Sequence, residues 1–277
     1  MKTLFLAVLL TSGFNSFAQY YYRDIIGTKE TEQMIQSYLR NKVTRVSLTS
    51  YDADNTRSDD FFVEQIFSTA SLNLKTTTRS GMSDQSILIT TVNAKGQVVK
   101  TTDSTGIMVS TTSYTYNADG TLAATTNNST DTTKNGLSED HIWQYVNGKV
   151  SRMLRIKDKV DTTVVQFKLD DNSNVVEEQS FHKGVKNDPV YYYYDSKNRL
   201  TDIVRFNNKA KRLLPEYMFE YSDENQVIQR ITVPANGSNY LIWRYQYSPN
   251  GLKVKEAVFD KQKQLIGKIE YSYQFGG

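Results

Sequence analysis

The side chains that most often perform chemistry in proteins are scarce or scattered in this sequence. The chain of 277 residues has no cysteine and only two histidines, His141 and His182. Without cysteine there is no disulfide framework, no thiolate nucleophile and no cysteine-ligated zinc. The two histidines lie in different segments, each near a turn and without a cluster of other ligands. We therefore expect them to be surface histidines and not metal ligands or catalytic bases.

Acidic residues offer one further candidate for chemistry. A group spaced somewhat like a calcium loop comprises Asp52, Asp54, Asn55, Asp59 and Asp60. Arg57 stands where such a loop needs glycine, so a solvated acidic turn is the simpler interpretation. No Gly-rich phosphate loop and no G-x-S-x-G motif is present, and no spacing of carboxylates indicates a glycosidase. The sequence therefore predicts no metal, no cofactor and no catalytic residue, and we expect a protein that is not an enzyme.

Aromatic residues are the feature with the clearest physical consequence. Aromatic side chains make up 12% of the chain, and in the segment 243–247 Trp243, Tyr245 and Tyr247 alternate with polar Arg244 and Gln246. This period of two is typical of a half-buried strand. A contiguous face of aromatic rings is rarely left in water. Two interpretations stay open: the sheet curls and buries the rings, or part of the aromatic face stacks on a sugar, a peptide or a lipid.

Two tyrosines fall outside that aromatic face. Alternation places Tyr191 and Tyr193 on the side opposite Tyr192 and Tyr194, which is otherwise polar. As additional surface rings, Tyr191 and Tyr193 are the candidate binding residues that the sequence predicts.

The strands that carry these rings are repeated. Residues that tolerate the left-handed backbone conformation recur at spacings of 24 to 28 residues, in the series Gly96, Gly120, Gly148, Asn174, Asn198, Asn225 and Gly251. Two residues after most of these turns stands an aliphatic residue, in the series Val98, Leu122, Val150, Val176, Leu200 and Val227. Four residues before four of them stands a tyrosine, in the series Tyr116, Tyr194, Tyr221 and Tyr247. A fixed period of this kind is the signature of a repeat architecture.

Each repeat of about 26 residues contains a second turn midway, so it reads as a β-hairpin. The sequence predicts an all-β fold, an antiparallel meander of repeated β-hairpins in a curled sheet or open barrel. We expect the hairpin domain to span residues 43–277, with clear repeats over 80–277 and one loop insertion from Asn127 to Asp140. Before it, within an N-terminal segment of residues 19–42, Ile35 and Tyr38 share one helical face, which predicts a short helix over residues 28–41.

The first 18 residues resemble a targeting segment. Lys2 is followed by a short apolar run, Leu4 to Leu10, and by the small-residue site that ends at Ala18. These are the three parts of a secretory signal peptide, so we expect cleavage after Ala18 and export to the periplasm or the cell exterior. Seven apolar residues are too few to span a bilayer, and no later stretch is long enough for a transmembrane helix.

Two motifs carry a family resemblance over about residues 80–277. The first is Tyr114-Thr115-Tyr116-Asn117-Ala118-Asp119-Gly120-Thr121-Leu122, and the second is Tyr192-Tyr193-Tyr194-Asp195-Ser196-Lys197-Asn198-Arg199-Leu200. Both resemble the Y-x-Y-D-x-x-G-x-L core of YD (RHS) repeats, with Asn198 in place of the glycine in the second. The resemblance implies β-hairpin architecture and transfers no active-site residue. Asp-Ser/Thr triplets such as Asp103-Ser104-Thr105 also resemble O-glycosylation sites of exported Bacteroidetes proteins, although polar turns explain them more simply.

These observations lead to one expected function and two competing ones. A net charge of +3 without a basic cluster excludes a nucleic-acid footprint. We expect an exported, non-enzymatic β-repeat protein, structural or binding carbohydrate or protein, whose partners are a polysaccharide or another exported protein. A half-open barrel that carries lipid or lipoprotein competes with it, although such a carrier would favour leucine and valine inside over tyrosine. A small outer-membrane β-barrel competes as well, although aromatic rings run along whole strands here and not only at their ends.

Overall fold

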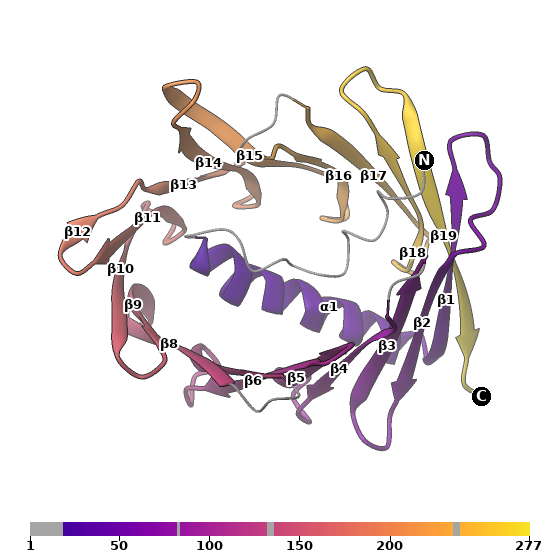
Figure 1. Cartoon of the computed structure of the whole chain (residues 1–277), viewed down its shortest axis with the longest axis horizontal. Coiled ribbons are helices and arrows are strands. Elements are labelled where there is room, and N and C mark those ends of the chain that lie inside the picture. The colour runs from indigo at the N-terminus through magenta and orange to yellow at the C-terminus, as the bar shows by residue number, and fades with distance from the viewer. Residues whose placement is uncertain (1–18, 82–83, 132–135, 235–238) are drawn as a thin grey trace.

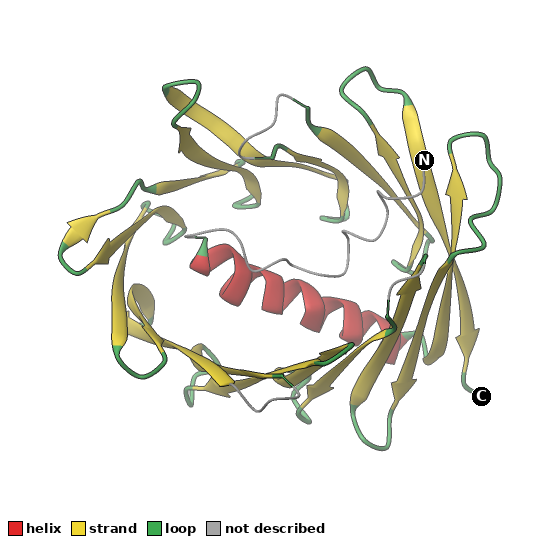
Figure 2. Ribbon diagram, in the orientation of Figure 1, coloured by secondary structure: helices red, strands yellow, loops and turns green. Residues whose placement is uncertain are grey.

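The computed structural model describes residues 19–81, 84–131, 136–234 and 239–277. In it, one antiparallel sheet winds around a helical N-terminal segment (Figure 1). The helices lie within the ring of strands (Figure 2). No helix in the described ranges combines the length and apolarity that crossing a membrane requires.

Two helical elements run one after the other through the interior. The π-helix η2 spans Tyr21–Ile26, and the α-helix α1 spans Gly27–Arg40. The helix predicted over residues 28–41 is therefore confirmed, while the π-helical turn before it was not predicted. Ile35 and Tyr38 are buried on one face of α1, as the sequence pattern indicates.

The strands follow one another along the chain as a meander. The first nine are β1 (Val43–Asp52), β2 (Phe61–Ser68), β3 (Asn73–Ser80), β4 (Ser86–Val92), β5 (Val98–Thr105), β6 (Met108–Tyr116), β7 (Leu122–Thr130), β8 (Gly136–Val146) and β9 (Lys149–Lys157). The other ten are β10 (Asp161–Leu169), β11 (Val175–His182), β12 (Val185–Lys186), β13 (Val190–Tyr194), β14 (Leu200–Asn207), β15 (Arg212–Tyr221), β16 (Val227–Thr232), β17 (Leu241–Tyr247), β18 (Lys253–Phe259) and β19 (Leu265–Phe275).

The sheet closes on itself. Strand β1 pairs with β2 on one side and with β19 on the other, where Val46 lies opposite Tyr273 and Ser50 opposite Ile269. The two-residue strand β12 pairs with β11, which also pairs with β13, so the closed ring contains 18 strands. The predicted meander is confirmed, but the curled sheet or open barrel is corrected to a closed barrel. Closure pairs the first strand with the last, which removes two sheet edges at which aggregation could begin.

One turn geometry recurs along the repeats. At the β4–β5 turn the amide of Asn93 donates to the carbonyl of Gln97, and the amide of Gly96 donates back to Asn93. The same pair of hydrogen bonds closes six further turns. The fourth residue of each turn has positive φ, in the series Gly96, Gly120, Ser173, Asn198, Asn225, Gly251 and Lys263. This is a type I turn followed by a left-handed residue that forms a bulge.

The sequence pattern predicts the left-handed turn residue at Asn174, one residue beyond its actual position. The left-handed residue of that turn is Ser173, at φ 70°, and Asn174 instead donates its side-chain amide to Asp170. Counting from Ser173, the aliphatic residue two positions after the turn is the fully buried Val175 and not the predicted Val176. The loop insertion predicted from Asn127 to Asp140 is also corrected: Asn127 in β7 lies opposite Glu139 in β8, so both ends of that segment are strand.

Tyrosine hydroxyls connect each hairpin to the one before it. The hydroxyl of Tyr221 donates to the carbonyl of Leu200, the first residue of β14, at 2.7 Å. Five more tyrosines bond in the same way to the first residue of an earlier strand, in the pairs Tyr116–Val98, Tyr145–Leu122, Tyr194–Val175, Tyr247–Val227 and Tyr273–Lys253. The tyrosine of the repeat motif therefore has a physical role: its hydroxyl satisfies a carbonyl at the bulged end of the ladder.

Replacing one of these tyrosines tests that role. We expect Tyr221→Phe to lower the free energy of unfolding by about 1 kcal/mol, because the Leu200 carbonyl loses its hydrogen-bond donor. Chemical denaturation measures the difference. Tyr193→Phe is the matched control, since half of the Tyr193 surface is exposed, and it should leave stability unchanged. Equal stability of Tyr221→Phe and the parent protein would contradict the role.

Candidate functional site

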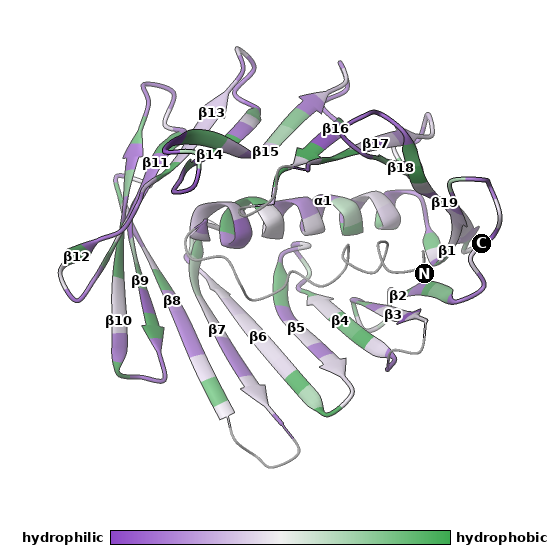
Figure 3. Ribbon diagram, turned by 45° about the horizontal axis from the view of Figure 1, so that its top comes forward, coloured by the Kyte–Doolittle hydropathy of each residue, from purple (hydrophilic) through white to green (hydrophobic). Residues whose placement is uncertain are grey.

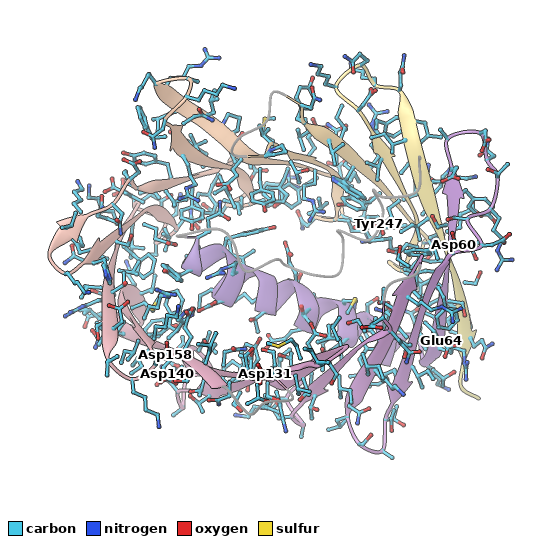
Figure 4. All side chains as sticks on the ribbon, in the orientation of Figure 1. Asp60, Glu64, Asp131, Asp140, Asp158 and Tyr247 are labelled. Carbon is cyan, nitrogen blue, oxygen red and sulfur yellow. The ribbon has the colours of Figure 1, made fainter. Side chains whose placement is uncertain are left out.

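The aromatic face of the sheet points into the barrel. Trp243 is only 4% exposed, and its strand neighbour Tyr247 lies on the lumen side of β17 (Figure 4). The helical elements fill part of this interior: the ring of Tyr21 packs on Tyr192, and the ring of Tyr22 packs on Tyr217. The interpretation that the sheet buries its own rings is thus confirmed in part, with the addition that the N-terminal segment covers them.

The helix α1 divides the interior into two sides. Its apolar face packs against the wall near β1 and β5, where Ile35 and Tyr38 join a buried cluster with Val46. Glu30 lies on the opposite face, and Gln33 borders a hollow between α1 and the β4–β5 turn. Burial raises the pKa of Glu30, whereas the positive charges of Arg230 on β16 and Lys253 on β18 lower it, so its carboxylate faces the wall that these strands form.

Five side chains from α1, β16, β17 and β18 gather inside the barrel between the helix and the wall. We call Glu30, Arg230, Trp243, Tyr245 and Lys253 the lumen cluster. The guanidinium of Arg230 lies 5.7 Å from the ring centre of Trp243, and the ammonium of Lys253 lies 4.5 Å from that of Tyr245. Desolvation by the enclosing wall raises the pKa of Glu30, and the positive charges of Arg230 and Lys253 partly offset this rise. Aromatic faces and charges of both signs thus share one enclosed surface.

Several buried polar atoms at this surface have no hydrogen-bond partner among the described residues. They include Nε of Arg230 and Nε1 of Trp243 in the wall, and Oγ of Ser37, which lies on the same helix face as Glu30. Burying such atoms without a partner is unfavourable, so native proteins rarely do it without a reason. Two donors beside an aromatic face are suited to bind the oxygen atoms of a ligand whose ring stacks on the wall.

The candidate residues predicted from the sequence lie elsewhere. Tyr193 is 50% exposed on the outer wall, while Tyr192 between Tyr191 and Tyr193 is buried inside. Tyr191 lies opposite Glu177 on the neighbouring strand, which forms an exposed ion pair with Lys168. The alternation was therefore predicted correctly, and it places both tyrosines on the outside, away from the lumen cluster. The acidic turn near Asp54 is exposed, and Asp54 accepts a hydrogen bond from the amide of Thr56.

The expectation of a surface histidine is wrong for His141. This residue faces inward from β8 and is buried against the helical segment, with Nδ1 2.5 Å from Asp24 of η2 and Nε2 2.9 Å from Glu139. Glu139 also binds Arg155 at 2.6 Å. The contact fixes η2 to the wall, which sequence spacing could not reveal because Asp24 and His141 are far apart in the chain. His182 remains partly exposed and lies 3.5 Å from Asp161.

The His141 contact predicts a pH dependence. Burial lowers the pKa of His141, but the carboxylates of Asp24 and Glu139 outweigh burial and raise it from 6.5 to about 9. Because the folded pKa lies above the unfolded one, the contact stabilises the fold fully below pH ~6.5 and loses that effect as the pH rises through about 9. The difference corresponds to roughly 3 kcal/mol. As the pH rises from ~6.5 to about 9, the melting temperature of the parent protein should therefore fall. We expect the melting temperature of His141→Gln to fall by less over the same range.

The matched control is His182→Gln, at the more exposed histidine. This variant should keep the pH dependence of the parent protein. If the melting temperatures of the parent protein and of His141→Gln change with pH in parallel, the ion pair of His141 with Asp24 and Glu139 is contradicted.

A hollow lies beside α1, at the β4–β5 turn. It measures about 440 Å³ and is lined by residues that include Lys29, Gln36, Arg40 and Lys95. Its carboxylate, from Glu32, already accepts hydrogen bonds from the amide of Val98 and the hydroxyl of Tyr116. This hollow is therefore a structural contact between helix and wall, and the lumen cluster is the stronger candidate site.

Comparison with known proteins identifies no family. No family model and no curated protein matches the chain. Among solved structures, a porin-like protein from Bacteroides uniformis is 12% identical, with a TM-score of 0.38 over 84% of this chain and 97% of the other. The Tc holotoxin pore of Photorhabdus luminescens is 12% identical, with a TM-score of 0.35 over 78% of this chain. The chain spans 12% of the length of that toxin chain and of the one in a TcdB2–TccC3–Cdc42 structure. These resemblances are weak.

Proposed function

We propose that this chain is an exported, non-enzymatic binding protein whose barrel encloses a short oligosaccharide at the lumen cluster. The observation that carries the proposal is the pair of buried donors, Nε of Arg230 and Nε1 of Trp243, which lack a partner within the described ranges and lie beside an aromatic wall. Sugars present apolar ring faces that stack on aromatic side chains and hydroxyl oxygens that accept hydrogen bonds, so they match both features. Glu30 and Lys253 add an acceptor and a further donor.

The outer wall favours an exported barrel surrounded by water over an outer-membrane barrel. Ion pairs stand on it: Lys168 on β10 pairs with Glu177 on β11 at 2.8 Å, and Lys268 pairs with Glu270 along β19 at 3.0 Å. The lipid-facing band of a membrane barrel is instead apolar, and charges there are destabilising. In Figure 3 the strand ribbons alternate between hydrophilic and hydrophobic residues around α1, as expected for strands whose two faces have different surroundings. The proposed export still depends on the signal peptide predicted in residues 1–18.

The same interior argues against a lipid carrier and against a hydrolase. A lipid carrier would need an aliphatic lumen, whereas the lumen cluster contains two aromatic and three charged side chains. A hydrolase would need a second free carboxylate, but Glu256 is buried and already accepts a hydrogen bond from Tyr271 at 2.6 Å and contacts Lys253 at 3.4 Å. Binding without catalysis is therefore the function that we propose.

Calorimetric titration tests the proposal with defined probes. Chitotriose, cellotriose, mannotriose and trigalacturonate are titrated into the parent protein, with a set of tripeptides in parallel. We expect one of the sugars to bind, and Arg230→Leu to weaken that binding about 10- to 100-fold through the loss of a charged donor.

Arg244→Leu is the matched control, because Arg244 lies on β17 opposite Gln229 and is exposed outside. It should leave affinity unchanged. Binding of a tripeptide and of no sugar would overturn the ligand class. Sugar binding that survives Arg230→Leu would overturn the site.

A further inference from the structure

The carboxylate of Glu178 receives the first residues of the described chain. Glu178 lies on β11 and is 1% exposed. Its Oε1 accepts hydrogen bonds from the backbone nitrogens of Gln19 at 2.8 Å and Tyr20 at 3.0 Å. Its Oε2 accepts from the backbone nitrogen of Tyr21 at 3.0 Å and from the hydroxyl of Tyr192 at 2.8 Å. Four donors thus converge on one buried carboxylate from the interior of the barrel.

Gln19 is held by a second carboxylate as well. It is 2% exposed, and its side-chain amide donates to Oε2 of Glu216, which lies 3.6 Å from Arg205. Desolvation raises the pKa of Glu216, partly offset by Arg205 and by the amide of Gln19. Both the backbone nitrogen and the side chain of Gln19 therefore meet an acidic group inside the barrel.

The backbone of Gln19 is strained only while a residue precedes it. Its φ is +95°, a left-handed conformation that favours glycine because a side chain there clashes with the backbone. The angle φ involves the carbonyl of the preceding residue. Cleavage after Ala18 would remove that carbonyl, and with it the strain. It would also convert the neutral amide of Gln19 into an α-ammonium group, which carries the charge that a buried carboxylate needs.

We infer that Glu178 and Glu216 form a binding site for the mature N-terminus, in which Glu178 pairs with the α-ammonium of Gln19 and Glu216 binds its side-chain amide. The site anchors the start of η2 to the wall, so removal of the leader strengthens the attachment of the helical segment in the lumen. This inference rests on the export and cleavage in the proposed function, and it is independent of the lumen ligand.

The test compares two exported precursors. One is the natural full chain, and the other has Gly-Ser-Gly inserted after Ala18, so that cleavage leaves an amide at Gln19 instead of an ammonium. We expect the insertion to lower the melting temperature of the secreted protein by about 10 °C, as the loss of a buried ion pair does. In a Glu178→Gln background the insertion should have little further effect, because the partner of the ammonium is gone. Glu177→Gln, at the neighbouring outward position, should retain the full difference.

Amine reactivity provides a second measurement if the insertion variant fails to accumulate. In the folded parent the α-amine should resist acylation, and in Glu178→Gln it should react. Equal melting temperatures with and without the insertion, or an equally reactive α-amine in both proteins, would overturn the inference. N-terminal sequencing separates the two proposals: a secreted protein that begins at Met1 refutes cleavage, whereas one that begins at Gln19 without the predicted effects refutes only the N-terminal site.

Discussion

Trp243→Ala is expected to lower the free energy of unfolding by about 3–5 kcal/mol, the range found when a large buried ring is removed. Trp243 is buried inside the wall, between the guanidinium of Arg230 and its strand partner Val258. Against a total stability of roughly 5–15 kcal/mol, this loss should sharply reduce the melting temperature and the yield of folded protein. Urea unfolding measures it directly.

Tyr191→Ala is the contrast for that experiment. It removes a ring of similar size from the outer wall, where neighbouring Tyr193 is half exposed, so its effect on stability should be mild. An unfolding curve of Trp243→Ala that overlays the parent would reject the assignment of this ring to the core. Trp243 would then have to be a ligand contact without a structural role.

Ile35→Ala is expected to have a comparable effect, about 2–5 kcal/mol, because Ile35 is fully buried between α1 and the wall. Its neighbours in the cluster include Val46 of β1 and Val98 of β5. A cavity there would weaken the attachment of α1 to the barrel. Chemical denaturation again gives the difference.

Gln33→Ala is the matched control on the same helix, because the side chain of Gln33 is exposed. Alanine is a good helix former, so this variant should fold as stably as the parent. Equal effects of Ile35→Ala and Gln33→Ala would mean that α1 does not pack on the wall through the face described above.

The repeat, the strands and the helix could be predicted from local sequence, because turn residues and alternation act over a few positions. Asn198 and Gly251 mark their turns by their own conformational preference. Closure could not be predicted in this way. It depends on pairing β1 with β19, strands at opposite ends of the hairpin domain, and residues 43–80 lack the turn series that identifies the later hairpins. Nothing local distinguishes an open meander from a closed one.

The candidate site was harder to predict for the same reason. Tyr191 and Tyr193 were chosen because they stand out on a polar face, and that face is the outer wall. The lumen cluster depends on the charge of Glu30 lying within reach of the charge of Arg230, which requires the position of α1 inside the barrel. One signal was present: Lys253 and Glu256 are charged residues on β18 that face the inward-pointing tyrosines of its neighbours. Charges on the aromatic side of a repeat strand indicate a polar interior.

The binding site itself can be tested through the fluorescence of Trp243. The chain has only two tryptophans, and Trp143 stacks on Phe167 in a different cluster, so Trp143→Phe leaves Trp243 as the single reporter. Titrating this variant with the sugar that binds in calorimetry should change the Trp243 emission in a saturable way, with the calorimetric affinity. Adding Arg230→Leu should shift this change to sugar concentrations about 10- to 100-fold higher. A sugar that binds by calorimetry while the emission of Trp243 stays constant would contradict a ligand site in the lumen.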